Sequence, residues 1–280
     1  STGERLRFAL AYWTILRALQ NFIGLREAKI ALTGAAPIPP DVVRFFRTLG
    51  VPLVEVYGLT ESTGMITGHS PDDVRIGTVG TPISGVEHRV ADNGELQIRG
   101  DMVFSGYYKQ PEATATTIQH DWLHTGDVVA ATPEGHLRIV DRLKDIMITA
   151  GGKNLTPSEI ENTMKASPFV KECIVVAEGR KFVSALVQID YETVGKWAEA
   201  QRLAFTHFRS LVELPQVRDM LQAQIDQGNA RLAQVAQIRR FHLLTKELDH
   251  DDGEVTATMK VRRSSIYKAY TEEIEAMYRG

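Results

Sequence analysis

Residues 51–64 read VPLVEVYGLTESTG, a stretch in which an apolar run changes abruptly into hydroxyls, one carboxylate and two glycines. Its first part, residues 51–56, is rich in β-branched residues and predicts a strand buried on both faces. The polar residues then follow the C-terminal end of that strand, which is where ligands collect in open α/β sheets. The stretch therefore predicts a binding loop, with a solvated turn as the competing interpretation.

The side chains of this loop suit a nucleotide. Tyr57 offers an aromatic face for stacking and Thr60 offers a hydroxyl for a phosphate oxygen. Glu61 offers a carboxylate able to hold a hard cation such as Mg²⁺. These three residue types together favour binding over a turn only slightly, so the surrounding chain decides the matter.

A second loop has the same setting. Residues 33–37 read TGAAP, follow a short predicted strand at 29–32 and precede a predicted amphipathic helix at 40–49. Small residues let the backbone approach a flat ligand closely. The order strand, helix, strand predicts that this loop and the loop after residue 56 lie at the same edge of a parallel sheet.

The composition is that of an ordinary globular protein. With 280 residues, 43% hydrophobic and 24% charged, the chain is long enough for about two domains of roughly 150 residues. A net charge of −3, with scattered basic residues, excludes nucleic-acid binding. The single cysteine, Cys173, lies in an apolar run and is expected to be a buried structural thiol. Without a membrane-spanning run or a signal peptide, we expect a cytoplasmic protein with at most peripheral membrane association.

The first half of the chain combines an α/β portion with a β subdomain. Apolar residues at helical spacing predict an amphipathic helix at 4–23, whose wide apolar face would suit a partner. Short strands with frequent turns predict an antiparallel β subdomain at about 75–141, interrupted by a helix starting near Pro111. Two hairpins are expected within it, at 86–100 around an Asn-Gly turn and at 128–140.

The second half has the pattern of a separate α+β domain. Its first helix is expected to begin at Thr156-Pro157, with Glu159 completing a capping box. Further elements are predicted in the order strand, strand, helix, strand, helix, and lie at 170–177, 182–189, 190–234 with a break near Pro215, 239–244 and 264–278.

Several polar residues have both a bland and a functional interpretation. Asp127 ends the run HTGD, where its carboxylate suits ribose hydroxyls but also suits a Gly-Asp turn. Arg142 and Lys144 have the pattern of solvated charges at a domain edge. Gly151 begins a Gly-Gly-Lys run that lacks the spacing of a phosphate loop and instead predicts a hairpin. Lys260 precedes the last helix on a loop, where a mobile lysine suits a phosphoryl group as well as solvent.

Together these stretches, in this order, resemble the motifs of adenylate-forming enzymes, and among them the long-chain fatty acyl-CoA synthetases. The resemblance covers nearly the whole chain. The stretches that carry it are TGAAP at 33–37, YGLTES at 57–62, HTGD at 124–127, DRLKD at 141–145, GGKN at 151–154 and the Thr-x-Thr-Met-Lys run ending at Lys260 within 253–263, the piece that most favours the long-chain branch.

The resemblance implies a role for each matching residue. The adenine pocket would be lined by Gly34, Ala35 and Pro37, with Tyr57 packed against the base and Gly58 beside it. Thr60 would contact phosphate and Glu61 would hold Mg²⁺. The ribose would bind Asp127 with help from Arg142. In the second domain, Lys144 would be the hinge, Gly151 would lie in the hairpin brought to the thiol tunnel, and Lys260 would be the catalytic lysine.

The implied reaction converts ATP, a fatty acid and coenzyme A into acyl-CoA, AMP and pyrophosphate through an acyl-adenylate. The implied fold is the end of a large AMP-binding domain at 1–142, with an α/β portion at 1–70 and a barrel-like antiparallel β subdomain at 71–142. A mobile α+β domain at 143–280 follows. An enzyme for another carboxylic acid, or a non-catalytic nucleotide-binding fragment, stays open as an alternative.

One departure from the family pattern has a direct consequence. No Ser/Thr/Gly-rich phosphate loop ending in Pro-Lys-Gly occurs before Thr33. The chain therefore resembles the C-terminal half of such an enzyme, and we expect it to be inactive alone. Apolar surface in residues 1–65 would then be covered by a second copy or by the missing N-terminal half.

Overall fold

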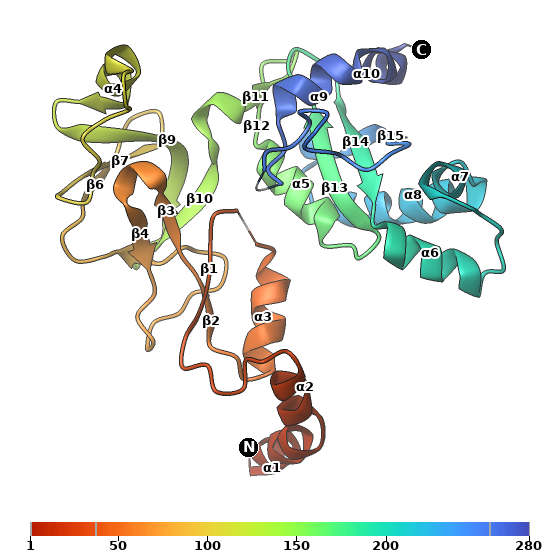
Figure 1. Ribbon diagram of the computed structural model, residues 1–280, viewed down its shortest axis with the longest axis horizontal. Coiled ribbons are helices and arrows are strands. Elements are labelled where there is room, and N and C mark those ends of the chain that lie inside the picture. Colours follow the sequence, from red (N-terminus) through yellow and green to blue (C-terminus); the bar gives the residue numbers. More distant parts are fainter. Residues whose placement is uncertain (1, 37, 258, 280) are drawn as a thin grey trace. The chain divides into compact units, whose positions relative to one another are not determined.

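The computed structural model describes residues 2–36, 38–257 and 259–279, and the chain forms two compact units, Ser1–Lys144 and Asp145–Gly280 (Figure 1). Each unit has buried apolar clusters of its own. The predicted combination of an α/β portion, an antiparallel β subdomain and an α+β domain is confirmed.

The α/β portion of the first unit is small. Strand β1 (Ala31–Thr33) pairs in parallel with β2 (Leu53–Glu55), and helix α3 (Pro40–Thr48) connects them. This confirms the predicted strand, helix, strand order. Val43 of α3 and Leu53 of β2 are buried in one cluster, whereas Leu32 of β1 is 55% exposed. Val54 of β2, the register partner of Leu32, is buried, so the exposure is confined to β1 and does not extend across a whole side of the sheet.

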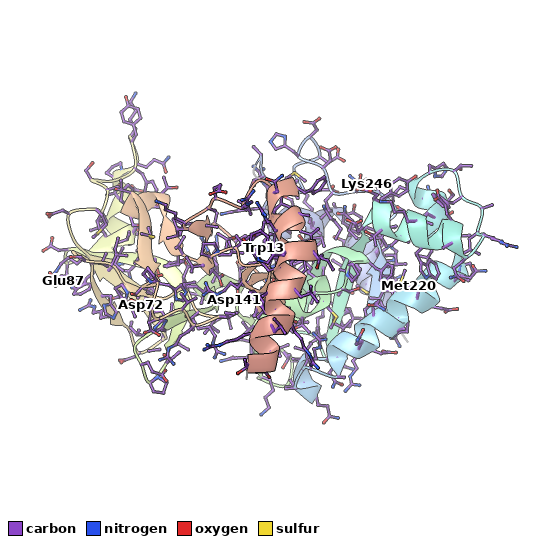
Figure 2. All side chains as sticks on the ribbon, turned by 90° about the horizontal axis from the view of Figure 1, so that it is seen from below. Trp13, Asp72, Glu87, Asp141, Met220 and Lys246 are labelled. Carbon is purple, nitrogen blue, oxygen red and sulfur yellow. The ribbon has the colours of Figure 1, made fainter. Side chains whose placement is uncertain are left out.

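The first helix is present but almost nothing covers it. It consists of α1 (Thr2–Ala11), a π-helical turn η1 (Tyr12–Leu16) and α2 (Arg17–Phe22). No described residue of α1 or η1 is buried. We call its exposed apolar side chains the apolar face; its main members are Leu6, Leu10, Trp13, which Figure 2 labels, and Phe22, which are 74%, 66%, 65% and 88% exposed.

The predicted binding loop is a β-hairpin, which corrects the sequence interpretation. The strand predicted at 51–56 ends at Glu55, and residues 57–68 form β3 (Tyr57–Leu59), a 3₁₀ turn η2 (Thr60–Ser62) and β4 (Gly64–Gly68). Strand β5 (Thr81–Pro82) adds to β4. The hairpin forms because Gly58 lacks a side chain: a Cβ there would lie 1.6 Å from the main-chain oxygen of Gly64.

The β subdomain is a curled antiparallel sheet in the order β10–β9–β7–β6, with β8 (Ile118–Gln119) paired to β9 and α4 (Pro111–Thr117) before it (Figure 1). Its main strands are β6 (Glu87–Val90), β7 (Glu95–Arg99), β9 (Trp122–Ala131) and β10 (Leu137–Arg142). Both predicted hairpins are confirmed. However, β9 begins at Trp122 and not at Val128, because its first residues pair with β8 and β7. Asp127 thus lies within a strand, not in a turn.

The second unit is built on a sheet in the order β13–β14–β15. One face of this sheet packs on α5 and α8, and the other on α9 and α10. The elements are β11 (Met147–Ile148), β12 (Asn154–Leu155), α5 (Pro157–Lys165), β13 (Val170–Val176), β14 (Val183–Ile189), α6 (Tyr191–Ala200), α7 (Phe208–Val212), α8 (Pro215–Asn229), η4 (Gln234–Ala236), β15 (Ile238–Leu243), α9 (Arg263–Ala269) and α10 (Thr271–Tyr278). The last helix, predicted as one, is interrupted at Tyr270.

Two smaller predictions for this unit have different outcomes. Thr156 and Pro157 begin α5 as predicted, but the Thr156 side chain makes no capping hydrogen bond; its main-chain oxygen accepts from the Glu159 amide instead. The predicted capping box is therefore wrong. Cys173 is fully buried, which confirms its predicted burial, and burial raises the pKa of its thiol. Across the described residues, no helix is long and apolar enough to cross a membrane.

Candidate nucleotide site

The loops that follow β1 and β2 lie against each other. The amide of Val56 donates to the main-chain oxygen of Thr33 over 2.8 Å. A Cβ on Gly34 would lie 2.9 Å from the Val56 oxygen, so only glycine permits this approach. Ala35 has a φ of 68° and turns the chain away after β1. Gly34 and Ala35 are both exposed, and Pro37, which was predicted beside them, lies outside the described residues.

Tyr57, Asp127 and Arg142 meet in one cluster, which we call the Asp127 cluster. The Tyr57 hydroxyl donates to Asp127 Oδ2 at 2.5 Å, and Arg142 Nε lies 2.9 Å from Asp127 Oδ1. Arg142 is opposite Asp127 in the register between β10 and β9, so the ladder itself places this ion pair. Three residues that are far apart in the sequence, and that the motifs singled out separately, therefore contact one another.

Burial controls the electrostatics of this cluster. Asp127 is 4% exposed, while the Arg142 side chain is 47% exposed and reaches solvent. Burial, followed by the nearby Asp127 charge, raises the pKa of the Tyr57 hydroxyl far above its usual range. The hydroxyl thus stays protonated and remains a donor to the carboxylate. A carboxylate held between a phenol and a guanidinium is a suitable acceptor for further hydroxyl groups.

Glu61 lies in the 3₁₀ turn η2 and is held by the chain around Tyr107. The Tyr107 hydroxyl donates to Glu61 Oε1 at 2.7 Å, and this bond is the main cause that raises the pKa of Tyr107. Glu61 and Tyr57 of the Asp127 cluster lie in consecutive elements of one hairpin, β3 and η2. Tyr107 also lines a cavity of about 600 Å³ formed by residues 105–108 and α4.

Thr60 and Gly58 complete the hairpin around Glu61. Thr60 is exposed at the start of η2, while Gly58 lies inside the close pairing of β3 with β4. Tyr107 was missed by the sequence analysis, because nothing local to its Gly-Tyr-Tyr run points to a carboxylate at position 61. Glu95, a buried carboxylate of β7, was not singled out either; a charged residue on the inward face of a predicted strand was the available signal.

The remaining predicted residues lie at the border of the first unit or in the second. Lys144 is exposed in the turn η3 (Leu143–Asp145). Gly151 is exposed in the turn between β11 and β12, which confirms the predicted hairpin. Lys260 is exposed on a loop closed by the bridge between Val255 and Val261, and its amide donates to Thr256 Oγ1 at 3.0 Å.

The residues of the candidate site fit a bound cation only if a bound ligand supplies some of its coordinating oxygens. Within the described residues, no group of three or more His, Cys, Asp and Glu side chains has the geometry of a metal site. Mg²⁺ commonly binds to one or two protein carboxylates and completes its shell with water and substrate phosphates. Glu61, a single carboxylate beside an open cavity, fits that arrangement.

Comparison with known proteins identifies the family. Residues 9–108 match the family described as AMP-binding enzyme, and residues 144–280 match the AMP-binding enzyme C-terminal domain. The chain belongs to the AMP-binding enzyme family. This confirms the resemblance drawn from the motifs, and both matches include residues of the candidate site.

Relatives of this AMP-binding chain are fatty-acid ligases. The fadD11 protein of Mycobacterium tuberculosis is 40% identical over 94% of the chain. The protein of Mycobacterium bovis named long-chain-fatty-acid–CoA ligase FadD15 is 34% identical over 98% of it. In both cases the chain spans 46% of the relative's length, so it corresponds to less than half of these proteins.

Among solved structures, the chain is similar to the adenylation domain of carboxylic acid reductase from Segniliparus rugosus, solved with AMP and a co-purified carboxylic acid. The TM-score is 0.72 at 26% identity, and the match covers 94% of this chain and 41% of that one. This likeness confirms the fold of an adenylation domain of the AMP-binding family.

Proposed function

We propose that the chain is the nucleotide-binding wall and C-terminal domain of a ligase that joins a long-chain fatty acid to coenzyme A using ATP. The observation that carries the proposal is the Asp127 cluster, in which Tyr57, Asp127 and Arg142 meet within a chain of the AMP-binding family. The name of the Mycobacterium bovis relative supports the long-chain substrate.

The proposed reaction has two steps. In the first, a carboxylate oxygen of the fatty acid attacks the α-phosphorus of ATP, and the bond to pyrophosphate breaks. In the second, the thiol sulfur of coenzyme A attacks the acyl carbon; the thiol proton goes to solvent and AMP leaves. Charge grows on phosphoryl oxygens in the first step, which makes positioned cations the main source of stabilisation.

In the first unit, the proposed roles concern binding. Gly34 and Ala35 let the backbone lie against adenine, and Tyr57 packs against the base. The resemblance assigns Pro37 to the same pocket. Asp127 accepts hydrogen bonds from both ribose hydroxyls, a task for which its nearly complete burial and its two partners hold it ready. Arg142 assists by pairing with that carboxylate.

The phosphate end of the proposed site lies at the hairpin. Thr60 contacts a phosphate oxygen, and Gly58 keeps the hairpin closed so that the hydroxyl of Thr60 is presented to the ligand. Glu61, oriented by Tyr107, would hold Mg²⁺ together with the phosphates. The bound cation would supply charge neutralisation at the phosphoryl group.

In the second unit, the proposed roles concern transfer. Lys260 neutralises the phosphoryl group during adenylation, Lys144 serves as a hinge, and the hairpin at Gly151 serves the thiol step. We place the functional domain boundary between residues 142 and 143, with the α/β portion at 1–70 and the β subdomain at 71–142. The proposed location is the cytoplasm, with at most peripheral membrane contact.

The apolar face supports a further part of the proposal. Exposed Leu6, Leu10, Trp13 and Phe22 form more apolar surface than a globular protein normally leaves uncovered. Since the chain corresponds to less than half of its relatives, we propose that the other half of the AMP-binding fold covers this face and supplies the phosphate loop. These 280 residues alone would then be inactive; fatty-acid-dependent pyrophosphate release from them would contradict this.

Co-expression tests the proposed function. The chain is produced together with the N-terminal half of the Mycobacterium bovis relative, and fatty-acid- and ATP-dependent formation of acyl-CoA is measured. Activity that appears only with both halves supports the ligase.

In that complex, Lys260→Ala should impair adenylation far more than thioester formation from supplied acyl-adenylate. Equal losses in both half-reactions would remove Lys260 from its role.

A second candidate is an adenylate-forming enzyme for another carboxylic acid. The likeness to a carboxylic acid reductase domain solved with a carboxylic acid favours it. A panel of long-chain, short-chain and aromatic acids offered to the same complex separates the two candidates. AMP binding without turnover of any acid would instead indicate a non-catalytic nucleotide-binding chain.

A further inference from the structure

Glu95 is a buried carboxylate that none of the proposed roles uses. Its side chain is 8% exposed at the start of β7. Oε1 accepts from the amide of Gly126 at 2.9 Å, and Oε2 lies 2.9 Å from His124 Nδ1. A buried carboxylate is costly unless it is hydrogen-bonded, so these contacts are what make the position tolerable. Oε2 also accepts from Gln97 Nε2 of the same strand at 3.4 Å, while the contacts with Gly126 and His124 lead to the segment of β9 that precedes Asp127.

That segment is a bulge. Glu95 of β7 pairs with Val128 of β9, and Gln97 pairs with His124. Two positions along β7 therefore correspond to four positions along β9. Thr125, Gly126 and Asp127 are thus opposite Leu96 alone, and Gly126 adopts a φ of 69°. Bulges bend a strand and re-aim its side chains, and they are frequent beside functional sites.

Side chains replace the ladder hydrogen bonds that the bulge removes. Glu95 binds the Gly126 amide, and the Thr125 hydroxyl donates to the Leu96 oxygen at 2.6 Å. The same hydroxyl accepts from the Asp127 amide at 3.1 Å. The backbone on both sides of Gly126 is therefore fixed by two side chains, one from each strand.

The consequence reaches the Asp127 cluster. Asp127 lies in the curled sheet, yet its carboxylate meets Tyr57, which belongs to the separate sheet of β3, β4 and β5. On its other side it is paired with Arg142 of β10. Both contacts depend on where the bulge places Asp127, and Glu95 is the side chain that holds the turn of the bulge.

We propose that Glu95 is a positioning residue of the nucleotide site: its carboxylate holds the Gly126 amide and thereby keeps Asp127 where the ribose hydroxyls of AMP bind. This inference rests on the proposed function, because it takes the ribose as the ligand of Asp127. Glu95 itself does not touch the nucleotide in this arrangement.

The test compares two nucleotides that differ only in what Asp127 would bind. Affinities of the chain for AMP and for 2′,3′-dideoxy-AMP are measured by calorimetry. Glu95→Met keeps the length of the side chain but removes both acceptors; we expect it to lose at least about tenfold of the preference for AMP while dideoxy-AMP binding changes less than about twofold. Equal losses for both nucleotides would overturn the proposal, since a general structural defect weakens both.

A conservative variant and a matched control sharpen the comparison. In Glu95→Gln, the amide oxygen can still accept from the Gly126 amide, and the amide nitrogen can donate to His124 when His124 Nδ1 carries no proton. This variant should therefore keep the preference for AMP over dideoxy-AMP within about threefold. Loss of the preference in Glu95→Gln as large as in Glu95→Met would show that charge matters, and not the hold on Gly126. Glu87→Met removes an exposed carboxylate from neighbouring β6, labelled in Figure 2, and should change neither affinity.

Two further measurements keep the outcome decisive. If Glu95→Met does not fold, Gly126→Ala replaces it as the test variant. A Cβ on Gly126 meets nothing within 4 Å, so this change disturbs the bulge only through its φ of 69°. The same selective loss of AMP binding is expected, and an unchanged preference for AMP over dideoxy-AMP overturns the proposal. If the unaltered chain binds neither nucleotide, the proposed ribose site fails.

A measurement without nucleotide then tests Glu95 separately. The shift in unfolding midpoint caused by Asp127→Asn should be at least halved in the Glu95→Met background. Equal shifts in the two backgrounds would mean that Glu95 does not act through Asp127.

Discussion

At the end of β2, Glu55 is buried enough to change its acid–base behaviour. Burial raises the pKa of its carboxyl to about 7, although a hydrogen bond with the backbone of Ile38 lowers it. The unfolded chain has the ordinary value of 4.5. The folded chain therefore binds the proton more tightly, and the free energy of unfolding falls as the pH rises from about 4.5 to about 7.

Replacing this carboxyl should remove that loss. We expect Glu55→Gln to raise the free energy of unfolding at pH 8 by about 1–2 kcal/mol, allowing for solvent screening at a partly exposed group, and to change it little at pH 5. Urea unfolding at both pH values measures this. The exposed Glu87→Gln is the control, and an equal gain at pH 5 and pH 8 would contradict the assignment.

In the second unit, Arg263 neutralises a buried carboxylate. Arg263 Nη1 lies 2.8 Å from Glu161 Oε1, and the two side chains are 21% and 11% exposed. Arg263→Met should lower the free energy of unfolding by about 3 kcal/mol, because Glu161 is left buried without its cation. Urea unfolding measures the loss. Lys196→Met, which breaks an exposed helical pair, should cost less than about 0.5 kcal/mol; similar costs for the two changes would refute the reasoning.

At the scale of the element, the hairpin of β3 and β4 depends on one missing side chain. Gly58→Ala would place a Cβ 1.6 Å from the Gly64 oxygen, so the strands must separate. We expect a loss of at least about 2 kcal/mol in the unfolding of the first unit, measured by urea denaturation. Gly68→Ala in β4 meets only ordinary contacts, at 3.5 Å, and should cost less than about 1 kcal/mol. A mild Gly58→Ala would mean that the hairpin is not closely paired.

The same element shows how far sequence reasoning reaches. Local signals were sufficient where the structure is local: the Asn-Gly turn at 93–94 gave a hairpin and Pro157 began a helix. They failed at Tyr57–Leu59, for which the sequence predicts a loop. These residues form a strand because they pair with residues 64–67, which follow the turn. Tyr107 lies 46 residues from Glu61 and Glu95 lies 31 residues from Gly126, so only the folded chain shows these contacts.

At the scale of the whole molecule, the apolar face is the feature that sets the behaviour of the chain. We expect Leu10→Ser, Trp13→Ser and Phe22→Ser together to abolish assembly with the N-terminal half, measured by sedimentation and by recovered ligase activity. The stability of the chain alone should hardly change, because these side chains are already exposed. Val90→Ser, an exposed apolar residue elsewhere, is the control. Assembly that survives the triple change would place the interface elsewhere. If the unaltered chain forms a dimer and the triple change abolishes that dimer, a second copy of the chain is what covers the apolar face.

The apolar face also has a practical consequence. A chain that holds the proposed ribose cluster and the lysine loop, but exposes the surface on which the rest of the fold would rest, is suited to be one half of a split reporter. Under the proposed function, the two halves fused to two proteins of interest would yield acyl-CoA only when those proteins bring them together. Substitutions in α1, which has no buried residue among those described, would then adjust the background of the signal without touching the proposed site residues.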